Sequence, residues 1–91
     1  MHAIVFQVDM KEGREEKEVR EELDQLIGFV ETLPGFVRGT WVNDGRRGLS
    51  LVVFESEEVA RNVAAGASMP PDSTATLRSV DVYEVWGEAP R

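Results

Sequence analysis

Cysteine is absent from the 91-residue sequence, and histidine occurs only once, as His2. Without thiols the fold can form no disulfide and no thiolate metal site, which is consistent with a reducing compartment. A lone imidazole does not make a metal site, and no cluster of histidine, aspartate and glutamate has ligand spacing. The sequence also lacks a P-loop, a G-x-G-x-x-G motif and a Ser-His-Asp constellation. We therefore expect no metal and no cofactor.

Long apolar runs and clustered basic residues are absent as well. The apolar run within the N-terminal MHAIVFQVDM is too short for a membrane span, and it lacks the basic residues that begin a signal peptide. The net charge is −7, and no basic run is longer than Arg46-Arg47, which argues against binding to nucleic acid or to an anionic membrane. The sequence thus predicts a cytoplasmic protein whose acidic charge favours solubility.

What is present is an alternation of strand-like and helix-like segments. The hydrophobic content of 42% is typical of a globular chain, and residues 1–91 are enough for one small domain. β-branched and aromatic residues indicate strands, whereas apolar residues at helical spacing indicate helices. In chain order we predict a strand at 2–9, a helix at 14–33, strands at 36–42 and 48–54, a helix at 57–69 and a long strand at 75–89.

This order predicts an α+β fold of the ferredoxin-like βαββαβ kind. Two right-handed crossings would place both helices on one face of a four-stranded antiparallel sheet. The first helix carries its apolar stripe on Val19, Leu23, Leu26, Ile27, Val30 and Leu33, and the second on Val59, Val63 and Ala67. Because each helix has only one stripe, the pair can cover only one face of the sheet.

The hairpin around Asp44-Gly45 shows how apolar the other face would be. If Asn43 lies opposite Gly48, one side of the hairpin carries Val37, Gly39, Trp41, Ser50, Val52 and Phe54. The other side then carries Phe36, Arg38, Thr40, Val42, Leu49, Leu51 and Val53. Neither side is polar enough for an ordinary water-facing surface, and an apolar patch of this size marks an interface or a pocket. We therefore predict a homodimer whose two sheets pack face to face and enclose a space.

Two junctions in the sequence resemble a known group of proteins. One is the Pro34-Gly35-Phe36 turn between the first helix and the second strand, and the other is the passage LVVFESEEVAR from strand into helix. Together, over residues 2–86, they make the chain resemble the dimeric α+β barrel superfamily, within which it is most similar to small antibiotic-biosynthesis-monooxygenase-like proteins. The resemblance implies the fold and the dimer. It carries little information about the reaction, because these are turn and core residues.

Members of that group with known activity imply two chemistries. Some are cofactor-independent oxygenases that oxidise polycyclic aromatic substrates in the cleft between sheet and helices. Others degrade haem with an asparagine on the first strand and a tryptophan and a histidine on or after the second helix. Here the first strand offers Gln7, the second helix reads VARNVAAG, and no histidine follows His2. The resemblance therefore does not extend to haem ligation.

Five residues are candidates for the ligand-binding site. Trp41 could line a cavity beside Gly39, whose missing side chain would leave room for a flat ligand, or it could be an interface anchor, which is the commoner role. Arg38 and Arg78 could each hold a carboxylate or phenolate of a ligand, or could pair with neighbouring carboxylates of the chain. Tyr83 could take part in proton transfer or serve only in packing.

Two functions of different classes remain open. The first is a cofactor-independent monooxygenase on an aromatic substrate, whose own electron-rich carbon would react with O₂ in a dry pocket. The second is a non-catalytic homodimer that binds a metabolite or a protein partner. No catalytic residue is assigned, because His2 lies where chain ends are usually frayed and nothing in the sequence shows a shifted pKa at Tyr83 or Asp81.

Overall fold

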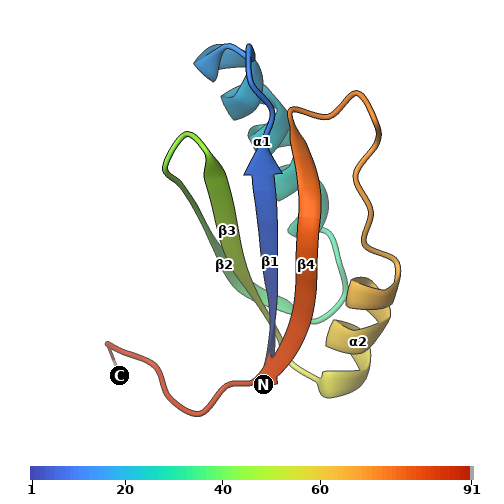
Figure 1. The fold of residues 1–91 in the computed structure, drawn as a ribbon. Helices are drawn as coiled ribbons and strands as arrows, with labels where there is room; N and C mark the ends of the chain where they lie inside the picture. Colours follow the sequence, from blue (N-terminus) through green and yellow to red (C-terminus); the bar gives the residue numbers. More distant parts are fainter. Residues whose placement is uncertain (91) are drawn as a thin grey trace.

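Figure 1 shows the computed structural model, which describes residues 1–90. Its elements are β1 (His2–Met10), α1 (Glu16–Val30), β2 (Phe36–Asn43), β3 (Arg47–Phe54), α2 (Glu57–Ala65) and β4 (Ala75–Glu84). The strands form a four-stranded antiparallel sheet in the order β2-β3-β1-β4. The predicted ferredoxin-like α+β fold is confirmed. None of the helices described is long and apolar enough to cross a membrane.

Three of the elements end earlier than the sequence pattern predicts. α1 ends at Val30 because Thr32 turns back onto the carbonyl of Phe29, to which its backbone N–H and its hydroxyl both donate, at 3.0 and 2.6 Å. α2 ends at Ala65, where the N–H of Gly66 donates to carbonyls of the last turn. β4 ends at Glu84 because its partner β1 begins at His2, which lies opposite Glu84.

The core lies between the two helices and one face of the sheet. Ile4, Val52 and Phe54 project from that face and are almost completely buried together with Ala60 of α2. Apolar side chains from both helices and from the α1–β2 turn pack against this cluster, namely Val30, Leu33, Val59, Val63 and Ala64. We call this side the helix-covered face, and the opposite side the open face.

The register of the hairpin is as predicted over most of its length. Trp41 lies opposite Ser50 and Gly39 opposite Val52. A bulge between Phe36 and Arg38 then shifts the register, so that Phe36, and not Val37, lies opposite Phe54. The rings of Phe36 and Phe54 meet edge to face, with centroids 6.2 Å apart. The prediction that Phe36 lies on the other side of the hairpin is therefore wrong.

α1 is less buried than its apolar stripe suggests. No residue of α1 is fully buried, and Leu26 and Phe29 remain 42% and 61% exposed. Val30, at its C-terminal end, packs against the core cluster. Apolar packing therefore holds one end of α1 firmly, and the rest of the helix needs another attachment.

A polar clamp supplies that attachment. Glu22 of α1 accepts hydrogen bonds from the hydroxyl of Ser73 and from the backbone N–H of Thr74, the latter at 2.9 Å, and both partners are buried. Burial acts to raise the pKa of Glu22, but the hydrogen bonds from Ser73 and Thr74 outweigh it, so the pKa lies below its ordinary value of 4.5. The ionised carboxylate thus joins α1 to the segment that leads into β4.

The Glu22→Gln substitution is expected to lower the free energy of unfolding at neutral pH by about 1 kcal/mol, because an amide accepts weaker hydrogen bonds than a carboxylate. A group with a depressed folded-state pKa stabilises the fold above its unfolded pKa, and this contribution is lost as the pH falls through the folded-state pKa. The difference from wild type should therefore shrink as the pH falls below 4.5 and vanish only below the lower pKa of the folded state. Urea denaturation at neutral and acidic pH measures it, and a difference that does not change with pH would contradict the clamp.

Candidate functional site

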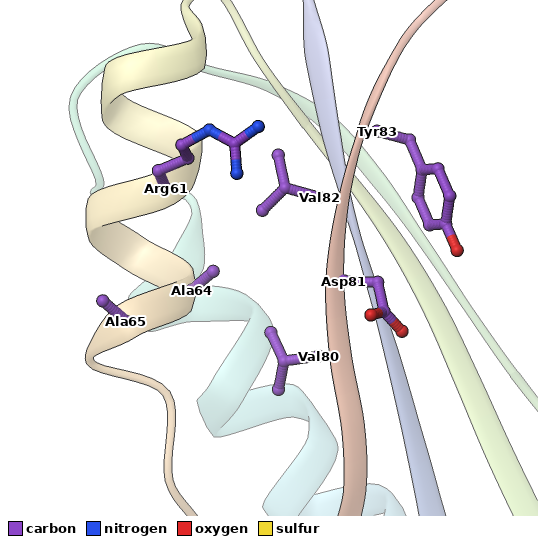
Figure 2. Close-up of a pocket in the computed structure, with 7 residues that line it drawn as sticks. All are labelled: Arg61, Ala64, Ala65, Val80, Asp81, Val82 and Tyr83. Atoms are coloured by element: carbon purple, nitrogen blue, oxygen red, sulfur yellow. The ribbon is translucent and has the colours of Figure 1, made fainter.

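A cleft of about 520 Å³ lies between α2 and β4 on the helix-covered side (Figure 2). Arg61, Ala64 and Ala65 line it from α2, and Val80 and Val82 line it from β4. Asp81 and Tyr83 border the cleft through β4, but Figure 2 shows that their side chains project from the other side of the strand. The lining of the cleft is therefore mixed: it combines the apolar side chains of Ala64, Val80 and Val82 with a similar amount of polar surface.

The cleft exists because a small side chain of α2 faces an edge strand. Ala64 fills little of the space between helix and sheet, whereas the Ala65 methyl group points away from β4 (Figure 2). β4 lies at the edge of the sheet order. Alternation along β4 turns Val80 and Val82 toward the helix. The outer backbone N–H and C=O groups of an edge strand have no strand partner, so they add hydrogen-bonding capacity beside the apolar wall.

Arg61 supplies the positive charge of the cleft. Its Nε and Nη2 donate to Glu57 Oε2 at 3.0 and 2.9 Å, which leaves Nη1 outside this pair. A hydrogen bond from Arg61, the charge of Arg61 and the neighbouring His2 together lower the pKa of Glu57 below its ordinary value. Glu57 thus holds the guanidinium at the rim of the cleft, where Figure 2 shows it directed toward β4.

His2 lies on the other side of Glu57 and is more ordered than the sequence predicts. Its Nε2 is 3.9 Å from the Glu57 carboxylate, and its side chain is only 18% exposed. It is held there because β1 begins at His2, which pairs with Phe54 of β3 and Glu84 of β4. The expectation of a frayed position is therefore wrong.

A second cavity, of about 350 Å³, lies on the open face. Ala3, Val5, Leu51 and Val53 line it from the sheet, and the segment after β4, residues 85–89, lines its other side. Val53 and Ala3 are 0% and 4% exposed although they project from the open face. The chain thus covers one end of its own open face with its terminal segment.

The five residues predicted to bind a ligand do not come together at one place. Trp41 and Gly39 lie on the helix-covered face, and a Cβ atom on Gly39 would come within 2.6 Å of the Trp41 ring. The space beside Gly39 is therefore filled by the Trp41 ring itself. Trp41 also packs against the core cluster.

Arg38 and Tyr83 are brought together on the open face. They lie at the two ends of one row across the sheet, through Val53 and Ala3, and both line the second cavity. Arg38 forms an ion pair with Glu88 of the terminal segment. Arg78 lies at the bulge of β4, farther along the strand, and its Nη1 is 3.6 Å from Asp9 Oδ1.

Of the residues that border the α2–β4 cleft, sequence reasoning singled out only Tyr83 and Asp81, whose side chains point away from it, and it missed Arg61 and the two valines. Arg61 reads in the sequence as one half of an exposed i, i+4 pair with Glu57, a pattern that is common on helix surfaces. Ala64 reads as a residue that allows close packing of helix and sheet. The cleft could have been predicted from one combination in the sequence: an arginine and small residues on a helix that lies beside an edge strand.

Chemically, the cleft can bind an anion that has an apolar body. Arg61 can donate a charge-assisted hydrogen bond, and the valines and Ala64 offer apolar contact. Among the lining residues no carboxylate or imidazole points into the space, so no side chain is placed to abstract a proton.

The cleft does not fit a haem held by an axial side-chain ligand. Its lining contains no histidine, and Gln7 lies on the open face, opposite Leu49 and Ser79. Within residues 1–90, no group of three or more His, Asp or Glu side chains could hold a metal ion. Any porphyrin here would have to bind through its apolar surface and its carboxylates.

Comparison with known proteins finds likeness in structure only. No family model matches the sequence, and no curated protein matches it. The crystal structure of a mutant of SnoaB, a cofactor-independent oxygenase from Streptomyces nogalater, superposes with a TM-score of 0.71 at 15% identity, covering 99% of this chain and 97% of that one. A mutant of MhuD, with two manganese protoporphyrin IX bound per active site, superposes with a TM-score of 0.69 at 21% identity, covering 97% of each chain.

This chain has the ferredoxin-like α+β fold of these two structures. The resemblance carried by the Pro34-Gly35-Phe36 turn and by the strand-to-helix passage is thereby confirmed at the level of the fold. This fold supports more than one chemistry, since one neighbour is an oxygenase and the other binds a metalloporphyrin. Function must therefore be argued from the residues of the cleft.

Proposed function

We propose that this protein binds a small molecule with a flat apolar body and an anionic group in the cleft between α2 and β4. The observation that carries the proposal is the placement of Arg61 at the rim of a cleft of about 520 Å³ beside the apolar side chains of Ala64, Val80 and Val82. The volume lies within the range of small-molecule sites, and the cleft is broadly open to solvent, so one side of the ligand would remain in water. The fold neighbour that binds manganese protoporphyrin IX supports the same ligand class, because a porphyrin has a flat apolar body with carboxylates.

The body of the ligand would contact Val80, Val82 and Ala64, and Arg61 would meet its anionic group. Apolar contact contributes roughly 25 cal/mol for each Å² removed from water, so about 300 Å² of ligand surface contributes about 7.5 kcal/mol, much of which the cost of association offsets. The expected affinity is therefore weaker than micromolar. The Arg61 guanidinium would mainly set the orientation of the ligand, since its side chain is 61% exposed and the charge is screened.

A second candidate function is oxygenation of an aromatic substrate without a cofactor. It is supported by the fold neighbour SnoaB, a cofactor-independent oxygenase. In this reaction Arg61 would stabilise the phenolate form of the substrate, whose carbon would then react with O₂. Oxygen uptake with a dihydroxyanthrone separates the two functions: turnover would support the oxygenase, and its absence over a varied panel of aromatic phenols would leave binding alone.

We further propose that the protein is a homodimer through the open face. Val42, Leu49, Leu51 and Tyr83 on that face are 54%, 41%, 40% and 57% exposed in a single copy. A contiguous exposed apolar surface of this extent is uncommon on a monomer. Packing two open faces together would remove it from water and would leave the α2–β4 cleft accessible on the outer side of each copy.

The Arg61→Gln substitution is expected to weaken binding of 1-hydroxy-2-naphthoate, a fluorescent aromatic carboxylate, by about tenfold, which is the loss of one partly screened charge-assisted hydrogen bond. Fluorescence titration of the purified protein measures the dissociation constant. Arg20→Gln is the matched control, because Arg20 also forms an exposed i, i+4 pair, with Glu16, but lies on α1.

Ala64→Leu provides an independent reading, since a larger side chain would occupy the cleft without changing its charge. It should weaken binding as much as or more than Arg61→Gln. Equal affinity of wild type, Arg61→Gln and Ala64→Leu for the naphthoate would rule out the α2–β4 cleft as the site.

A further inference from the structure

The side chain of Trp86 is exposed to solvent, although the segment that carries it is attached to the rest of the protein. Trp86 is 92% exposed, the highest value among the large hydrophobic residues. The backbone N–H of Val85 donates to the carbonyl of Met1 at 2.9 Å, and Glu88 pairs with Arg38. The segment is thus attached on both sides of Trp86, while the ring makes only an indole N–H bond to Glu84 Oε1 at 3.0 Å. Such an attached and exposed tryptophan is typical of an interface anchor.

An exposed apolar patch lies at the other end of the same face. Val42 of β2 lies opposite Leu49 of β3, close to the turn of the hairpin, and both project from the open face. Trp86 follows the opposite end of the sheet, where Glu84 pairs with His2 (Figure 1). Each copy of the chain therefore carries the anchor at one end of the open face and a patch that could receive it at the other.

We propose that Trp86 of each copy packs on Val42 and Leu49 of a second copy. The two copies would be related by a two-fold axis that lies between the sheets and runs across the strands, so that the hairpin end of one copy meets the terminal segment of the other. This arrangement is isologous, so the contact between Trp86 and the Val42–Leu49 patch forms twice in each dimer. The inference rests on the homodimer proposed above and specifies its register.

The distribution of charge favours this orientation. Arg46 and Arg47 lie at the hairpin end, are exposed, and form no ion pair within residues 1–90. Glu84 and Glu88 lie at the other end, on or beside the terminal segment. Asp44 and Asp9 lie near these arginines and offset part of their charge. A two-fold axis across the strands brings Arg46 and Arg47 of each copy toward Glu84 of its partner, whereas an axis along the strands would bring the two arginine pairs together.

The area of the face also calls for an anchor. Four strands of about eight residues, with spacings of about 4.8 Å between strands and 3.3 Å along them, make a face of roughly 500 Å². Two such faces only reach the lower bound of about 1,000 Å² for a specific interface. A buried tryptophan adds roughly 150–250 Å² for each copy, which raises the interface toward the standard size.

Sedimentation equilibrium of the full chain tests the contact through a double-mutant cycle. Trp86→Ala and Val42→Ser are each expected to raise the dimer dissociation constant at least about tenfold. Because both remove the same contact, the double variant should be little weaker than Trp86→Ala alone. Both residues are exposed in a single copy, so circular dichroism should show an unchanged fold. Phe29→Ala, which removes another exposed aromatic ring but from α1, is the matched control and should leave the constant unchanged.

The outcomes separate this contact from the dimer itself. A wild-type dimer that Trp86→Ala does not weaken would overturn the anchor and leave the homodimer standing, as would a double variant whose loss equals the product of the single losses. A wild type that stays monomeric at a concentration of about 100 μM would overturn both proposals.

Discussion

Phe54→Ala is expected to lower the free energy of unfolding by about 3–5 kcal/mol, the cost that accompanies removal of a fully buried aromatic side chain. Phe54 is 0% exposed and belongs to the buried cluster with Ile4 and Val52. Its ring also meets Phe36 edge to face, a contact that the truncation would remove. The cavity would lie where β3 joins the helices, and neither Phe36 nor Ile4 can fill it without leaving its own place.

This loss is large for a chain of 91 residues, whose total stability is of order 5–14 kcal/mol. Urea denaturation followed by circular dichroism should show a lower midpoint at an unchanged slope. Phe29→Ala removes the same atoms from a ring that is 61% exposed and should cost less than about 1 kcal/mol. Similar losses for the two variants would show that the edge-to-face cluster is not the centre of the core.

Leu51→Asp is expected to raise the dissociation constant of the proposed dimer by at least about 100-fold. Leu51 lies opposite Val5 and Thr40 near the middle of the open face, and it is 40% exposed in a single copy. The carboxylate would be hydrated in the monomer but would lose its water without gaining a partner between two sheets. An uncompensated buried charge costs several kcal/mol, and about 2.7 kcal/mol already corresponds to 100-fold.

Size-exclusion chromatography with light scattering, over a range of protein concentrations, measures the change. Leu26→Asp is the matched control, since Leu26 is 42% exposed on α1 and the variant carries the same added charge. The homodimer through the open face would be rejected if Leu51→Asp associated as strongly as wild type. Equal weakening by both variants would also count against it, because the effect would then arise from net charge alone.

Local pattern was sufficient for the order of the elements and for much of the pairing. The strand and helix periods and the Asp44-Gly45 turn predicted the βαββαβ order and the register that places Trp41 opposite Ser50. Ser56 was predictable as the N-cap of α2, and its hydroxyl accepts from the N–H of Val59 at 3.2 Å. These features depend on residues close in sequence or on a turn that sets the alignment of its own strands.

The candidate site was not predictable in the same way. The sequence shows that Gly39 and Trp41 project from the same face of β2. It does not show whether the helices cover that face or the opposite one. The structure turns Trp41 toward the helices, where its ring occupies the space over Gly39. Arg38 and Tyr83 line one cavity from opposite edges of the sheet, an arrangement that depends on the order of the strands.

By itself, then, the sequence determined the fold class, the apolar nature of both sheet faces and the turn that aligns the hairpin, because these follow from periodicity and local conformational preference. Only the tertiary structure decided which face is covered, that the bulge after Phe36 brings that ring onto Phe54, and that Arg61 of α2 stands beside Val80 and Val82 of the edge strand β4. Those contacts join residues far apart in the chain. They form only when both helices pack on the sheet, and no short stretch of sequence specifies that packing.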